Sequence, residues 1–164
     1  HGTTIRLLLP SGSSGGEREG PVVDLPVVRG NGEHILIVED DVELRRIMAD
    51  LVGSLGYGVD VSGSGRDALR LFDDGFECDL LLSDIVMPGG IGGFELGEQV
   101  RAIRPDMPIV YMSGYTGFTE AEMGTAIGPF VQKPCSPSEL SKALSGALGV
   151  TVGGEGFRPP RGRT

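Results

Sequence analysis

The chain has 164 residues, with 14 lysines and arginines against 23 aspartates and glutamates, which gives a formal net charge of −9. This acidic balance argues against nucleic acid as a partner, because binding to a phosphate backbone needs a basic surface. No apolar stretch in the sequence approaches the roughly 20 residues of a membrane span, so we expect no membrane contact by this segment and a cytoplasmic location. The two cysteines, Cys78 and Cys135, fit neither a disulfide framework nor a metal-ligand spacing.

Composition divides the chain into a central domain and flanking segments. Residues 11–33 and 150–164 are rich in glycine, serine, proline and charge. Such segments have little to bury, so we expect a flexible linker and a disordered tail. Residues 34–149 have the length and apolar content of one domain with its own core.

Within the predicted domain, apolar runs alternate with segments of helical spacing. The runs predict strands that begin near Ile35, Tyr57, Asp79, Pro108 and Pro129. They are continuous rather than alternating, which is typical of parallel strands that are covered on both faces.

Helices are predicted between the strands, because apolar residues there recur three and four positions apart. The first has an apolar face made of Leu44, Ile47, Met48, Leu51 and Leu55. The stretch 119–126 gives the weakest helix, and residues 136–139 form a capping box that starts the last one. Five strand–helix units predict an α/β fold, a three-layer doubly wound (βα)5 flavodoxin-like parallel sheet with strand order 2-1-3-4-5.

Polar residues with complementary chemistry follow four of the predicted strands. Glu39 and Asp40 follow the first strand, Asp84 ends the third, Ser113 follows the fourth and Lys133 follows the fifth. Parallel strands bring these positions to one carboxyl edge, where open α/β sheets bind ligands. A lone aspartate after a strand is usually a turn or a cap, but agreement at four strand ends favours a functional site.

The chemistry of this cluster points to phosphoryl transfer. Asp84 is the candidate nucleophile, since a carboxylate can accept a phosphoryl group. Glu39, Asp40 and Asp84 are candidate Mg²⁺ ligands, together with the backbone carbonyl of Val86.

Two further residues are predicted to contact the phosphoryl group. Lys133 can pair with one phosphoryl oxygen, and the Ser113 hydroxyl can donate to another. One lysine cannot balance three acids, so we expect the site to be unfavourable until a divalent cation enters.

The same residues resemble the receiver domain of bacterial two-component response regulators. The matching stretches are residues 35–41, 84–88, 112–115 and 133–134, within a region that spans residues 35–148. The resemblance implies that Asp84 accepts phosphate from a phosphohistidine on a sensor histidine kinase, with Mg²⁺ required. It further implies that Ser113 moves toward the phosphoryl group, that Phe130 rotates inward as a switch, and that the peptide before Pro134 is cis.

Residues 1–10 resemble the final strand of a histidine-kinase ATP-binding domain. Together with the receiver motifs, this suggests the C-terminal receiver of a hybrid sensor histidine kinase, whose parent protein would be attached to the membrane. After residue 149 too few residues follow for a DNA-binding output domain. We therefore expect protein partners, namely a histidine kinase in cis or in trans and a histidine phosphotransfer protein, and a monomer or weak dimer.

Two other functions remain open from the residues alone. An aspartate-nucleophile, Mg²⁺-dependent phosphatase has a similar fold but usually carries a second aspartate two positions after the nucleophile, where this chain has Val86. A pseudo-receiver that serves only as an interaction domain typically lacks an acid or the lysine, and all of them are present here. We expect a phosphoacceptor rather than an enzyme with turnover.

Overall fold

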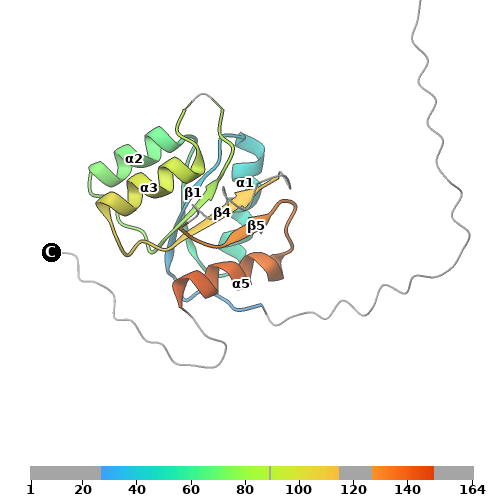
Figure 1. Ribbon diagram of the computed structural model, residues 1–164. Coiled ribbons are helices and arrows are strands. Elements are labelled where there is room, and N and C mark those ends of the chain that lie inside the picture. Colours follow the sequence, from blue (N-terminus) through green and yellow to red (C-terminus); the bar gives the residue numbers. More distant parts are fainter. Residues whose placement is uncertain (1–26, 89, 115–126, 150–164) are drawn as a thin grey trace, which may run out of the picture.

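The computed structural model describes residues 27–88, 90–114 and 127–149. Within them, five parallel strands form one sheet in the order β2-β1-β3-β4-β5 (Figure 1). The strands are β1 (His34–Val38), β2 (Gly58–Ser62), β3 (Leu80–Asp84), β4 (Ile109–Ser113) and β5 (Phe130–Gln132). The predicted α/β fold class and strand order are therefore confirmed, and each strand begins within one residue of its predicted start.

Four helices lie between or after these strands in the described residues: α1 (Val42–Ser54), α2 (Gly65–Asp73), α3 (Gly93–Ile103) and α5 (Pro137–Leu148). Three of them begin at a side-chain cap. The side chains of Asp41, Ser64 and Ser136 each accept a hydrogen bond from a backbone N–H in the first helical turn. The predicted capping box is present, since Glu139 in turn accepts from the Ser136 backbone. The predicted helix at 119–126 lies outside the described residues.

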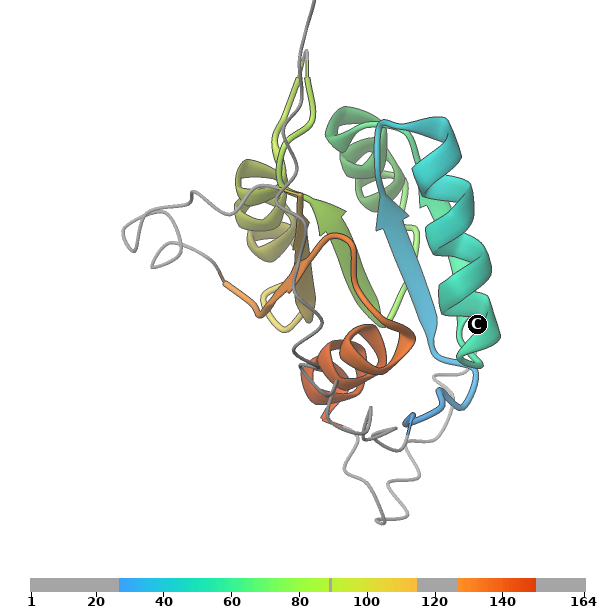
Figure 2. The ribbon, with the colours of Figure 1, turned by 90° about the vertical axis from the view of Figure 1, so that its right-hand side faces the viewer.

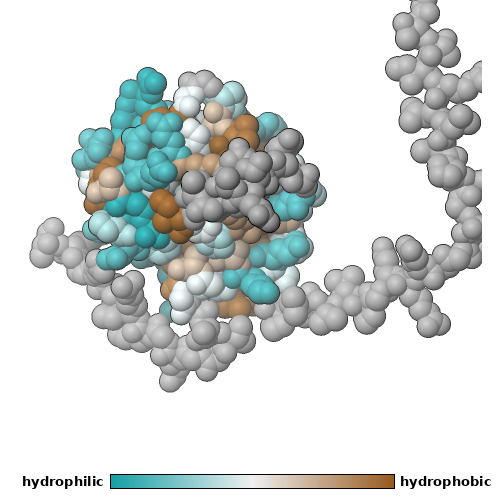
Figure 3. All heavy atoms as spheres, in the orientation of Figure 1, coloured by the Kyte–Doolittle hydropathy of each residue, from teal (hydrophilic) through white to brown (hydrophobic). Residues whose placement is uncertain are grey.

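The helices cover both faces of the sheet and make three layers (Figure 2). Helices α1 and α5 pack on one face, where Met48, Val52 and Leu144 meet alternate strand residues such as Ile37 and Leu82. Helices α2 and α3 pack on the other face, over the intervening strand residues. Both faces of the central strands are therefore buried, which explains their continuous apolar sequences. The outer surface of α2 and α3 carries hydrophilic side chains (Figure 3).

One apolar residue assigned to the core by spacing lies on the surface, since Ile47 of α1 is 59% exposed. Val52 is instead fully buried on α1, because the helix rotates Met48, Val52 and Leu55 toward the sheet. The spacing therefore gave the correct helix with an apolar face displaced by part of a turn.

Residues 28–32 pack against the end of the domain where the strands begin. Gly30 N–H donates to the Leu55 carbonyl at 2.8 Å and Gly32 N–H to the Gly56 carbonyl at 3.1 Å. The buried Ser141 hydroxyl of α5 donates to the Val28 carbonyl at 2.7 Å. The end of the expected linker 11–33 is thus attached to α1 and α5. No helix in the described part of the chain is both long and apolar enough to cross a bilayer.

Candidate functional site

Three carboxylates meet at the carboxyl edge of β1 and β3. The two strands are neighbours, and Val38 pairs with Ser83, so Glu39 and Asp84 follow paired residues. One oxygen from each of Glu39, Asp40 and Asp84 lies within 4.8 Å of the others. The topology thus brings together the acids that the sequence separates by more than forty positions.

Lys133 joins this cluster from the end of β5. Its ammonium donates to Oδ2 of Asp84 at 2.8 Å and also to Oε2 of Glu39. All three groups are largely removed from solvent, and Glu39 is only 1% exposed. The peptide between Lys133 and Pro134 is cis, as the family resemblance implies.

Burial dominates the electrostatics of Glu39. Loss of solvation raises the pKa of its carboxyl, the hydrogen bond and charge of Lys133 lower it, and the charge of Asp84 raises it again. The net direction is upward from the usual value of 4.5. The hydrogen bond and charge of Lys133 therefore do not fully offset the cost of burying the Glu39 carboxylate.

The loop from β1 into α1 is fixed at both ends. Glu39 N–H donates to the Ser62 carbonyl at 3.2 Å, and Asp41 caps α1 by accepting from Leu44 N–H at 2.9 Å. Between these points, Nη1 of Arg45 donates to the carbonyls of Glu39 at 2.7 Å and Asp40 at 3.3 Å. The two acids therefore project from a backbone that is held by hydrogen bonds.

The loop after Asp84 is packed tightly against α3. A Cβ atom on Gly93 would lie 2.2 Å from the Asp84 carbonyl oxygen, so the first residue of α3 has no room for a side chain. Val86 has an exposed side chain, and its N–H donates to Oδ1 of Asp84 at 3.3 Å. This contact orients the Asp84 carboxylate; the Val86 carbonyl as a metal ligand stays a prediction.

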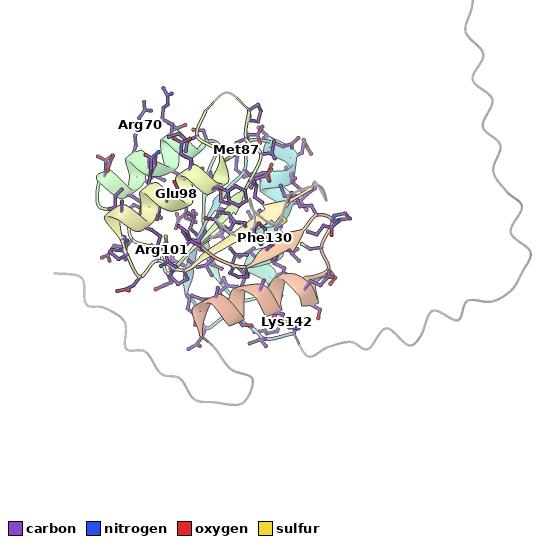
Figure 4. All side chains as sticks on the ribbon, in the orientation of Figure 1. Arg70, Met87, Glu98, Arg101, Phe130 and Lys142 are labelled. Carbon is purple, nitrogen blue, oxygen red and sulfur yellow. The ribbon has the colours of Figure 1, made fainter. Side chains whose placement is uncertain are left out.

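Ser113 and Phe130 extend the site toward β4 and β5. Ser113 is buried at the end of β4, one residue beyond the Met112 that pairs with Asp84. Phe130 begins β5 (Figure 4). Its ring packs on those of Tyr111 and Phe94, with centroid distances of 5.7 and 6.0 Å respectively. Of the two predicted switch residues, Ser113 thus lies beside the carboxylates and Phe130 lies in an aromatic cluster.

The donor set suits a hard divalent cation. Mg²⁺ prefers carboxylate oxygens and usually keeps water or phosphate oxygens as further ligands. Glu39, Asp40 and Asp84 supply three such carboxylates from two strand ends, with ligand atoms close enough to share one ion. Their partial burial beside one ammonium makes a second positive charge favourable.

Comparison with known proteins identifies the family of this chain. Residues 35–145 match the response regulator receiver domain. The chain belongs to this family. The match covers both acid-bearing strand ends, the Ser113 position and the Lys133 position of the receiver domain.

Individual relatives agree with this assignment. The probable transcriptional regulator ycf27 of Cyanidium caldarium is 30% identical over 117 residues, which are 70% of this chain and 46% of that protein. The chain thus matches less than half the length of that regulator. A response regulator receiver protein from Sinorhizobium medicae has a similar structure, with a TM-score of 0.66 and 27% identity, over 73% of this chain and 96% of that one.

A third relative was crystallised with ligands. The response regulator protein TrrA from Thermotoga maritima, in complex with Mg(2+)-BeF, has a TM-score of 0.63 and 28% identity to this receiver. The similarity covers 70% of this chain and 98% of TrrA.

Sequence reasoning overlooked Arg45, Gly93 and Tyr111. Gly93 lies within a run of glycines whose individual roles the sequence does not separate. Arg45 follows the cap Asp41 by one helical turn, and helical side chains lean toward the N-terminus, which is a signal that could have placed it against the loop.

Proposed function

We propose that this receiver accepts a phosphoryl group on Asp84 from a kinase phosphohistidine, in a reaction that requires Mg²⁺. The observation that carries the proposal is the convergence of Glu39, Asp40, Asp84 and Lys133 at one strand edge. An Asp84 oxygen attacks phosphorus, the phosphorus–nitrogen bond to the histidine breaks, and the imidazole leaves with the bonding electrons.

The residues of the chain have distinct tasks in this reaction. Val86 N–H and Lys133 orient the Asp84 carboxylate, and Lys133 can follow the developing charge onto the transferred group. Ser113 supplies a hydroxyl at the end of the neighbouring strand. A bound Mg²⁺ would neutralise charge on the phosphoryl oxygens. The Mg(2+)-BeF complex of TrrA supports this assignment, because that relative was crystallised with the same cation.

Phosphorylation would act as a conformational switch through Ser113 and Phe130. The ring of Phe130 is partly buried against Tyr111 and Phe94. A shift of Ser113 toward the phosphoryl group would change the packing at the junction of β4 and β5, and so bias a two-state equilibrium.

The test compares three proteins with acetyl phosphate or phosphorylated histidine kinase as donor. The wild type should be labelled in the presence of Mg²⁺ and not after chelation. The variant Asp84→Asn should take no label, while the control Asp50→Asn, at an exposed position of α1, should be labelled like the wild type. Undiminished labelling of the Asp84 variant would refute the assignment.

A phosphatase with turnover is the competing function. Val86 occupies the position where such an enzyme would need a second acid, and its side chain is exposed and apolar. Repeated release of phosphate from a model ester, over many cycles per site, would favour the phosphatase.

For the parent protein, we propose a hybrid histidine kinase attached to the membrane, with this receiver in the cytoplasm and with a histidine kinase, in cis or in trans, and a histidine phosphotransfer protein as partners. This proposal rests on the resemblance of residues 1–10 to a kinase strand, whereas the relative from Cyanidium caldarium is named a probable transcriptional regulator. The gene sequence upstream of His1 tests it, since a hybrid kinase requires a phosphorylatable histidine motif and an ATP lid there.

A further inference from the structure

Arg45 makes the contacts that connect α1 to the two acids after β1. Its backbone N–H donates to the Asp41 carbonyl at 2.8 Å, within the first turn of the helix. Its half-buried side chain reaches back, and Nη1 donates to the carbonyls of Glu39 at 2.7 Å and Asp40 at 3.3 Å. One guanidinium nitrogen therefore bridges two consecutive peptide groups.

We propose that Arg45 is a positioning residue for the magnesium site, which it serves by fixing the backbone that aims the Glu39 and Asp40 carboxylates at Asp84. This inference rests on the proposed function. Carbonyls that leave a strand have no further partner in the sheet, so the guanidinium limits the rotation of both peptide groups. Rotation of those peptides would turn the Glu39 and Asp40 side chains away from the shared centre.

Gly63 provides the space for this contact. A Cβ atom there would lie 3.2 Å from Nη1 of Arg45, which is tighter than ordinary van der Waals contact. Gly63 follows β2, whose last residue, Ser62, accepts from Glu39 N–H. A methyl group at position 63 would therefore push the guanidinium by a few tenths of an ångström, without touching the carboxylates themselves.

A lysine at position 45 separates geometry from charge. Lysine keeps the positive charge but carries a single flexible ammonium in place of a planar guanidinium. A loss of Mg²⁺ affinity in Arg45→Lys would consequently report the positioning contact and not a changed field. Arg46 offers a matched control, because it is the next residue on α1 and its side chain is exposed.

The experiment is a calorimetric titration of MgCl₂ into the full 164-residue chain. We expect Arg45→Lys to bind Mg²⁺ about tenfold more weakly, which corresponds to about 1.4 kcal/mol. Arg46→Lys should bind as the wild type does, and Gly63→Ala should also bind more weakly. The double variant Arg45→Lys/Gly63→Ala should be no weaker than Arg45→Lys alone, because both changes remove one contact.

Thermal unfolding without Mg²⁺ measures how Arg45→Lys changes the stability of the domain, separately from its effect on Mg²⁺ affinity. Unchanged Mg²⁺ affinity in Arg45→Lys, whatever its unfolding temperature, would overturn the inference. If that variant does not fold, Gly63→Ala carries the test, and unchanged affinity there would overturn the inference in the same way.

Phosphorylation by acetyl phosphate distinguishes this failure from failure of the proposed function. Arg45→Lys should reach wild-type labelling once Mg²⁺ is raised to saturation. A labelled wild type with unchanged affinity in Arg45→Lys would refute the positioning role alone. A wild type that binds Mg²⁺ but takes no label would refute the phosphoacceptor role and leave the positioning role standing.

Discussion

The ammonium of Lys133, the residue after β5, lies 2.8 Å from Oδ2 of Asp84, the last residue of β3, although β4 separates the two strands. The side chain of Lys133 therefore crosses the end of β4 to reach the acid cluster. It also pairs with Glu39, the residue after β1, so one cation contacts the acids at two other strand ends.

Removal of this cation should destabilise the domain in the absence of Mg²⁺. We expect Lys133→Met to lower the free energy of unfolding by about 3 kcal/mol at pH 7, because it leaves two buried carboxylates without their partner. Urea unfolding in the presence of a chelator measures the effect. The only other lysine, Lys142, is exposed on α5 (Figure 4), so Lys142→Met is a matched control with little expected effect. Equal stability of the two variants would contradict the ion pairing.

The raised pKa of Glu39 predicts a pH dependence of stability. Burial is its main cause, and the folded pKa lies above the usual 4.5. The folded state then binds the proton more tightly than the unfolded chain does. The resulting stability is fully present below about pH 4.5 and is lost as the pH rises through the folded pKa.

Glu39→Gln removes the titrating carboxyl. The difference in free energy of unfolding between this variant and the wild type at each pH therefore reports the contribution of Glu39. In a chelator, the stability of the variant relative to the wild type should increase from below pH 4.5 toward neutral pH. A difference for Glu39→Gln that falls with rising pH would mean that Lys133 outweighs burial.

The site residues were predictable because each follows a recognisable apolar run. Glu39, Asp84 and Lys133 could be placed at strand ends from the sequence, and parallel strands necessarily share one carboxyl edge. Apolar runs do not by themselves state which strands are neighbours; the strand order was predicted as the flavodoxin-like order that suits five consecutive strand–helix units with right-handed crossovers.

Contacts that depend on helix rotation or on close backbone approach were not predictable. The exposed Ile47 shows that spacing alone leaves the buried face of α1 uncertain by part of a turn. Arg45 and Gly93 act on backbone carbonyls, which are identical in every sequence and so leave no local pattern. Such contacts become visible only when the loops are placed in space.

Gly93 gives a prediction about the loop after Asp84. Its missing side chain leaves room for the Asp84 carbonyl, and an added Cβ would also lie 2.8 Å from Ile85 Cα. Backbone atoms cannot move aside as a side-chain tip can, so Gly93→Ala should lower the free energy of unfolding by about 2 kcal/mol. It should also slow labelling of Asp84 by acetyl phosphate.

The control for this prediction is Gly90→Ala in the same loop, where a Cβ atom would meet nothing within 4 Å. We expect that variant to stay within about 0.5 kcal/mol of the wild type. Urea unfolding measures the free energy of unfolding of both variants. A Gly93→Ala protein as stable as Gly90→Ala would show that the loop can adopt another conformation.

Residues 28–32 predict where the folded unit begins. Their hydrogen bonds reach the end of α1 and the middle of α5, and Gly30 lies against the ring of the buried Tyr57. A chain that starts at Val27 should therefore be more stable than one that starts at Glu33, by about 2 kcal/mol, because the shorter chain loses several hydrogen bonds and uncovers Tyr57. Urea unfolding of the two truncated proteins, with identical C-termini, measures the difference.

The variant Gly30→Ala in the longer protein should reproduce much of the loss, since its Cβ would lie 2.3 Å from Cδ1 of Tyr57. Equal stability of both truncated proteins would instead place residues 28–32 in the linker, and the upstream segment would then be connected to the receiver without a fixed anchor on α1 and α5.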